Sequence, residues 1–138
     1  MSEEKFLTHY DVSASALTTE RLRMRLIANN IANMNTTRTV EGGPYKRMEA
    51  VVQTKMLNKS KFDQGVSVTK VTLDQSPPRL VFDPAHPDAN AQGYVGYPNI
   101  DMVREAANLK RATMAYDANA TVLDAIKKTV DAALRIGG

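Results

Sequence analysis

The chain has 138 residues with neither cysteine nor tryptophan, and its 18 basic and 15 acidic side chains give a formal net charge of +3. The absence of cysteine excludes disulfides, cysteine–zinc sites and thiol catalysis. The charge is spread along the chain, without the basic stripe typical of nucleic-acid-binding proteins. No stretch approaches the ~20 apolar residues that span a bilayer. The acidic N-terminus also lacks the apolar segment of a cleavable secretory signal.

The apolar content is low for a chain of this length. Apolar residues make up 43% of the sequence, but 17 of them are alanine. All six prolines and five of the seven glycines lie between residues 42 and 98, and these residues destabilise helix interiors. We therefore expect a mainly α protein with a small β insert, divided into a helix in 1–40, loops and short strands in 41–98, and a helix in 99–138.

The N-terminal segment predicts a helix from about Glu4 to Met34. Its apolar residues recur every seven positions, and an adjoining row is interrupted at Ser13 and Glu20. The main row is Tyr10, Leu17, Met24 and Ile31, and the adjoining row contains Phe6, Ile27 and Met34. The spacing is that of an amphipathic helix with one apolar face.

The middle segment predicts short strands over 46–56, 65–73 and 79–82. Within the second strand the alternation shifts phase between Val68 and Val71, which indicates a β-bulge. A turn is expected at 75–78 and an ordered loop at 83–92, where prolines restrict the backbone. Gly42 and Gly43 predict a flexible joint, and the tyrosines at 94 and 97 are expected to pack on the adjacent strand or the helix base.

The C-terminal segment predicts a second long helix, capped by Asn99 or Asp101 and ended by Gly137. Its seven-residue row is Met102, Leu109, Tyr116, Leu123 and Val130, with a second row of Ala106, Ala112, Ala120, Ile126 and Ala133. Five heptads of this kind indicate a coiled coil. The two helices are expected to pair with each other, and their outer faces with other chains.

Candidate catalytic groups are weak. His86 lies between Asp83 and Asp88, and a carboxylate-flanked histidine can act as a base or metal ligand. A loop histidine between prolines is the better interpretation. The hydroxyl residues near Ser13 and Ser15 have no histidine placed near them in sequence, and the glycine pairs lack the phosphate-loop pattern. We expect no catalytic, cofactor or metal site.

An unusual cluster of asparagines lies at 29, 30, 33 and 35, in a stretch that also contains Ile27 and Ile31. Asparagine is a poor helix former. Two interpretations remain open. The amides can cap a fraying helix end, or they can form hydrogen bonds between chains that fix the register of an assembly.

The same stretch, IANNIANMNTT, resembles the N-terminal signature of bacterial flagellar axial proteins of the rod and hook. Further motifs resemble the proximal-rod members of that family: EGGPYKR at 41–47, SPPRLVFDPAHPDA at 76–89, GYVGYPNIDMV at 93–103 and the closing segment 112–137. Lys110 and Met114 depart from the usual family pattern. The resemblance covers nearly the whole chain.

The resemblance implies a structural subunit of the periplasmic rod in the flagellar basal body, without enzymatic activity or cofactor. Its partners would be other rod proteins, further copies of itself and the flagellar type III export apparatus. Terminal helices would pack around a central export channel and transmit torque. The expected assembly interface is formed by Tyr10, Leu17, Met24, Ile27, Asn29, Asn30, Ile31, Asn33, Asn35, Met102, Leu109, Tyr116, Asn119, Leu123, Ile126 and Val130.

Two other classes of function compete with this one. A helical adaptor or chaperone that binds axial proteins would show the same amphipathic ends. An enzyme that uses His86 is the more remote alternative. A rod subunit is found in purified basal bodies, whereas an adaptor is not.

Overall fold

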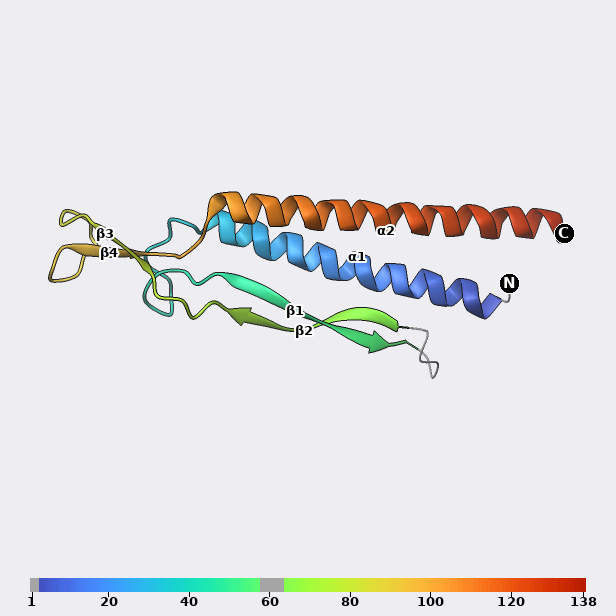
Figure 1. Ribbon diagram of the computed structural model, residues 1–138, viewed down its shortest axis with the longest axis horizontal. Helices are drawn as coiled ribbons and strands as arrows, with labels where there is room; N and C mark the ends of the chain where they lie inside the picture. Colours follow the sequence, from blue (N-terminus) through green and yellow to red (C-terminus); the bar gives the residue numbers. More distant parts are fainter. Residues whose placement is uncertain (1–2, 58–63) are drawn as a thin grey trace.

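The fold is an elongated arrangement of two long helices and two small sheets (Figure 1). The computed structural model describes residues 3–57 and 64–138. Its elements are, in chain order, α1 (Glu3–Ala32), β1 (Met48–Met56), β2 (Gln64–Leu73), β3 (Arg79–Phe82), β4 (Tyr94–Tyr97) and α2 (Met102–Ile136). In Figure 1, α1 lies between α2 and the β1–β2 hairpin, and β3–β4 forms the end far from both termini. The prediction of paired terminal helices around a small β insert is confirmed.

α1 and α2 run antiparallel, side by side (Figure 1). α1 ends two residues before the predicted Met34, and the Asn33 N–H still donates to the Asn29 carbonyl at 3.0 Å. α2 begins after Asp101, the second of the two predicted caps. The Asp101 carboxylate accepts from the N–H groups of Val103 and Arg104 at 2.9 and 3.3 Å. α2 is the longer helix, and its last turns extend beyond the first turn of α1 (Figure 1).

The β1–β2 hairpin contains the predicted bulge. Val51 pairs with Lys70 and Val52 with Val68, so Thr69 is the extra residue in β2. The hairpin packs along α1 through Ser15, whose Oγ accepts from the Val66 N–H at 3.1 Å. A side chain at Gly65 would bring its Cβ to 2.7 Å from Ser15 Oγ. The missing side chain therefore allows the start of β2 to approach the helix closely.

The β3 strand occupies the predicted residues, whereas β4 was not predicted. Val81 and Val95 are partners across this small antiparallel sheet, and Val95 is fully buried. On the other face, the rings of Phe82 and Tyr94 meet edge to face, with centroids 5.3 Å apart. The prediction that Tyr94 packs on the adjacent strand is confirmed. The guanidinium of Arg79 lies 5.6 Å from the centroid of the Tyr97 ring.

The apolar core is small, as the composition indicates. Among the described residues, the buried apolar side chains are Leu26, Ile27, Val95, Pro98 and Ala112. Of the predicted α2 rows, Ala112 is buried and Leu109, Tyr116 and Leu123 are half-buried, whereas Met102 and Val130 are exposed. Over the described part of the chain, neither helix has a stretch apolar enough to cross a membrane.

Candidate functional site

At the end of the helical pair nearest the β insert lies a polar cluster, which we call the clasp: Asn30, Tyr45, Arg47 and Glu105 with the backbone of Met48. The Asn30 side chain is 0% exposed. Its Nδ2 donates to the Met48 carbonyl at 2.9 Å and to Glu105 Oε2 at 3.2 Å. Its Oδ1 accepts from the Met48 N–H at 2.8 Å and from the Tyr45 hydroxyl at 3.0 Å. Both amide hydrogens and both lone pairs are thus used.

Glu105 brings a carboxylate into the interior, where it is 1% exposed. It lies in the first turn of α2, where the helix dipole favours a negative charge. Its Oε1 accepts from Arg47 Nε at 2.7 Å, and its Oε2 accepts from Asn30. A buried carboxylate is tolerated when it is paired and hydrogen-bonded in this way.

Arg47 and Tyr45 precede β1 and complete the clasp. Arg47 also donates from a terminal nitrogen to Glu49 at 3.1 Å. Burial acts to lower the pKa of Arg47, but the hydrogen bonds and charges of Glu105 and Glu49 together outweigh it, so that pKa is raised. Burial, and secondly the charge of Glu105, raise the pKa of the Tyr45 hydroxyl. At neutral pH the clasp therefore holds a positive guanidinium and a neutral phenol.

The clasp joins three elements at one place. Asn30 lies in the last turn of α1, Arg47 immediately before β1, and Glu105 in the first turn of α2. Asn30 and Glu105 are 75 residues apart in sequence. The Asn30 amide binds both the N–H and the carbonyl of Met48, as a neighbouring strand does in a hydrogen-bonded pair of an antiparallel sheet. The arrangement fixes the angle at which the two terminal helices leave the β insert.

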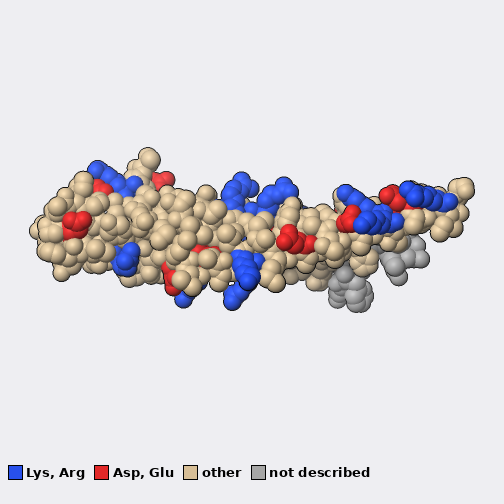
Figure 2. All heavy atoms as spheres, turned by 90° about the horizontal axis from the view of Figure 1, so that it is seen from above, with Lys and Arg blue, Asp and Glu red and all other residues tan. Residues whose placement is uncertain are grey.

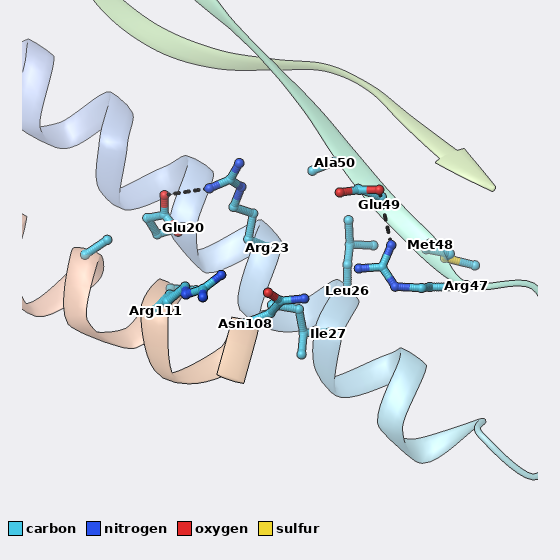
Figure 3. Close-up of a pocket in the computed structure, with 12 residues that line it drawn as sticks. Glu20, Arg23, Leu26, Ile27, Arg47, Met48, Glu49, Ala50, Asn108 and Arg111 are labelled. Atoms are coloured by element: carbon cyan, nitrogen blue, oxygen red, sulfur yellow. Dashed lines mark hydrogen bonds and ion pairs between the residues drawn. The ribbon is translucent and has the colours of Figure 1, made fainter. Parts of the chain in front are cut away.

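A groove of about 380 Å³ runs beside the clasp, between α1, β1 and α2 (Figure 3). Its floor includes Leu26 and Ala112, and charged side chains from all three elements form its rim. Glu20, which interrupts the predicted apolar row, faces this groove. Its Oε1 accepts from Arg23 at 3.4 Å, and its buried Oε2 has no hydrogen-bond partner among the described residues. The groove therefore combines a few apolar side chains with a predominantly polar lining that carries charges of both signs.

The predicted interface residues lie at different depths in the single chain. Ile27 and Asn30 are buried. The half-buried residues are Leu17, Met24, Ile31, Asn33, Leu109, Tyr116, Asn119, Leu123 and Ile126. The exposed residues are Tyr10, Asn29, Asn35, Met102 and Val130. The two helices bring Met24 Sδ within 3.6 Å of the Thr113 hydroxyl, and Tyr10 near Ile126.

The asparagine cluster divides into two roles within the chain. Asn33 Nδ2 donates to the Asn29 carbonyl at 2.9 Å, and Asn33 Oδ1 accepts from the Thr36 hydroxyl at 3.1 Å. These bonds cap the end of α1, as the first interpretation requires. Asn30 instead forms the intrachain clasp, which neither interpretation anticipated. Bonds between chains remain a prediction for Asn29 and Asn35, whose side chains are exposed.

The groups considered for catalysis have structural contacts. His86 Nδ1 accepts from the Asp88 N–H at 3.0 Å, and the His86 ring lies edge-on to Tyr97. The Ser15 hydroxyl donates to the Val12 carbonyl at 2.7 Å. Across residues 3–57 and 64–138, no group of three or more histidine and carboxylate side chains could hold a metal ion.

Comparison with known families agrees with this architecture. The model of the family described as "Flagella basal body rod protein" matches residues 11–38. The model described as "Flagellar basal body rod FlgEFG protein C-terminal" matches residues 91–136. The two matched segments contain most of α1 and all of α2, the two helices that the clasp joins. Both matches place the chain in the class of flagellar basal-body rod proteins.

Curated relatives narrow the class. The chain is 42% identical over 142 residues to the flagellar basal-body rod protein FlgC of Bacillus subtilis, covering 92% of this chain and 95% of the relative. It is 39% identical to FlgC of Borreliella burgdorferi, with 91% and 93% covered. For FlgC of Escherichia coli O157:H7 the identity is 35%, with 95% and 97% covered. The chain belongs to the FlgC family of flagellar basal-body rod proteins, which confirms the predicted family.

Proposed function

We propose that this chain is a subunit of the proximal rod that assembles through α1 and α2 with other rod proteins and with further copies of itself. In this role the paired helices line the export channel and transmit torque through many repeated contacts. The family membership supports the rod. The proposed interface is the set of helix residues predicted above, with Asn30 contributing indirectly because its amide is fully used within the chain.

The distribution of apolar side chains carries this proposal. Large apolar side chains of α2 are exposed along its length, among them Val103, Met114, Val122, Leu134 and Ile136. Each of these side chains exposes apolar area that contact with another chain would remove from water. Association with neighbouring subunits would cover it and supply burial that the small core lacks. The heptad rows favour coiled-coil packing for these contacts.

The clasp gives the proposed torque-bearing unit its stiffness. Because Asn30, Arg47 and Glu105 bind one another across three elements, bending the helical pair away from the β insert would break buried hydrogen bonds. Such bonds are costly to leave unmade. A rod subunit needs a rigid connection between the helices and the β insert, because a flexible one would bend under torque instead of transmitting it.

The small apolar core also suits delivery through the export apparatus. A chain with few buried apolar side chains can pass through in a partly unfolded form and become ordered on docking. In the assembled rod, we expect the terminal segments 1–40 and 99–138 to form the inner layer. The insert 41–98 would form the outer layer, in the periplasm.

Purified basal bodies test the proposal against the helical adaptor. The tagged chain is expressed in motile cells that lack their own copy, and basal bodies are isolated. We expect the chain to co-purify with the rod and to restore motility. An adaptor would restore motility but be absent from the purified rods, and that result would overturn the proposal.

Hydrogen exchange gives a second readout. In the isolated chain, the amides in the last turns of α2 should exchange fast, because these turns extend beyond α1. In the assembled rod the same amides should be protected. Uniformly slow exchange along α2 in the isolated chain would contradict assembly-coupled ordering.

A further inference from the structure

Two polar residues, Ser13 and Glu20, interrupt an apolar row of α1, and both lie inside the fold. Ser13 is 6% exposed, and the Glu20 side chain is 14% exposed. Glu20 of α1 and Arg111 of α2 line the same groove (Figure 3). Among the described residues, however, the only ion pair of Glu20 is the one with Arg23.

One carboxylate oxygen of Glu20 is enclosed without compensation. Its Oε2 is buried and has no hydrogen-bond partner among the described residues. The single bond, at 3.4 Å, goes from Arg23 to Oε1, and the Arg23 side chain is 47% exposed. A buried oxygen that loses water without gaining a donor costs free energy, and a partly exposed ion pair offsets little of that cost. The closed helical pair is therefore weakened at Glu20.

The buried side chains of α1 change in character on the two sides of Glu20. Among residues 7–19, the buried side chains all carry hydroxyl groups: Thr8, Ser13 and Thr19. On the other side, Leu26 and Ile27 are buried next to the clasp residue Asn30. Because apolar burial contributes about 25 cal/mol per Å², the part of α1 nearer the N-terminus is held less firmly.

α2 shows the same gradient. Its buried residues are Glu105 and Ala112, and none of residues 113–136, all of them described, is buried. The Thr113 hydroxyl lies 3.6 Å from Met24 Sδ, so this unburied part of α2 runs beside the part of α1 that precedes Met24. The molecule also narrows toward the end that carries the chain termini (Figure 2), which leaves fewer neighbouring side chains to cover either helix there.

We propose that Glu20 is a break point in the helical pair. The terminal section, residues 7–20 and 115–136, opens and closes, while the clasp section, residues 21–32 and 102–114, stays formed. Opening hydrates the Glu20 carboxylate and removes its desolvation cost. It also frees half-buried seam residues such as Leu17 and Ile126 for contact with a neighbouring subunit. This use in docking rests on the proposed rod function, whereas the opening itself does not.

Native-state hydrogen exchange of the isolated full-length chain measures the opening. The amides of residues 9–19 should exchange at least about tenfold faster than those of residues 24–32, because they open without loss of the clasp. Glu20→Met replaces the carboxylate by an apolar side chain of similar length. It should slow exchange of residues 9–19 about tenfold, as expected when an unpaired buried charge is removed, and leave residues 24–32 unchanged.

Two further variants make the comparison specific. Arg21→Met is the matched control, because Arg21 is exposed on the same helix and arginine and methionine have similar helix propensities. It should leave exchange of both segments unchanged. Glu20→Gln removes the charge but keeps a polar end, so it should slow exchange of residues 9–19 less than Glu20→Met does. Circular dichroism verifies the helix content of each variant.

The outcomes separate the break point from the rod function. Equal exchange on both sides of Glu20 in the unmodified chain would overturn the proposal, and so would a Glu20→Met variant that behaves like Arg21→Met. If opening serves docking, purified basal bodies should contain less Glu20→Met than unmodified chain. Equal amounts would show that docking does not use the opening. If the unmodified chain is absent from basal bodies, the proposed function fails, whatever the exchange rates show.

Discussion

The two ends of the helical pair are held together by different chemistry. Near the β insert, the helices meet at the clasp, where Asn30 and Glu105 are buried and each polar group has a partner. Near the chain termini, Leu7, Tyr10, Ile126 and Val130 border an open groove of about 290 Å³. One end is thus closed by directional bonds within the chain, and the other leaves apolar surface in water.

This difference indicates that the two ends of the helical pair have different roles. Directional hydrogen bonds specify one geometry, because a buried polar group without its partner is costly. Apolar contacts tolerate a range of partners and grow with the area they cover. The clasp end therefore sets the orientation of the helices, while the terminal end is available to neighbouring subunits.

The largest expected effect follows from breaking the clasp. Asn30→Ala leaves both Met48 backbone groups, the Tyr45 hydroxyl and Glu105 Oε2 without their amide partner. We expect the free energy of unfolding of the isolated chain to fall by about 3 kcal/mol, measured by urea denaturation.

The neighbouring Asn29→Ala is the matched control, because the Asn29 side chain is exposed. Its effect should remain within about 0.5 kcal/mol. Equal effects of the two substitutions would show that the clasp does not govern stability at this end.

A smaller loss of stability, with a large effect on assembly, is expected at the other end. Leu123→Asp places a charge at a half-buried position of α2, in the predicted seven-residue apolar row. The isolated chain should lose about 2 kcal/mol of stability, and cells that carry the variant should form no rods. Ile31→Asp should act in the same way.

Thr121→Asp provides the comparison, because Thr121 is exposed and its hydroxyl donates to the Asp117 carbonyl of the same helix. Motility assays should show swimming for this variant. Normal motility of both Leu123→Asp and Ile31→Asp would contradict the assignment of these residues to the seam.

The elements of the fold that follow from local patterns could be predicted from sequence. Both helices follow from seven-residue spacing in stretches without glycine or proline, and the bulge opposite Val51 and Val52 follows from the phase shift along β2. β4 was missed because Tyr94–Tyr97 is short and includes Gly96. Its pairing with β3 depends on the conformation of the loop 83–92, which cannot be predicted from local sequence patterns.

The clasp could not be predicted for a related reason. In the sequence, Glu105 is indistinguishable from an ordinary acidic residue of a first helical turn, which is usually solvated. Its burial depends on Asn30, which is 75 residues away, and on Arg47 from a third element. The sequence does show Asn30 among apolar residues, which indicates a buried polar side chain. That pattern alone does not indicate which residue forms hydrogen bonds with it.

A moderate effect is expected from Tyr45→Phe. The substitution removes the hydrogen bond to Asn30 Oδ1 at 3.0 Å and should cost about 1 kcal/mol. Because the pKa of Tyr45 is raised above its ordinary 10.0, the folded chain holds the phenolic proton more tightly than the unfolded chain does. The associated stability is fully present below pH 10.0 and is lost as the pH rises through the folded value.

Denaturation between neutral and strongly alkaline pH tests the sign of this shift. The stability of the unmodified chain should fall more steeply above pH 10.0 than that of Tyr45→Phe. Parallel curves for the two chains would show that the phenol does not titrate differently in the folded state.

The smallest expected effect on the isolated chain lies at the far end of α2. Leu134 is 70% exposed, so Leu134→Ser should change the free energy of unfolding by less than about 0.5 kcal/mol. Leu26→Ser, at a buried position of α1, should cost several times more. If Leu134→Ser nevertheless reduces self-association and rod formation, the apolar surface at the termini acts between chains rather than within one. An unfolding loss as large as that of Leu26→Ser would place Leu134 in the core of the single chain, and the contrast between the two ends would fail.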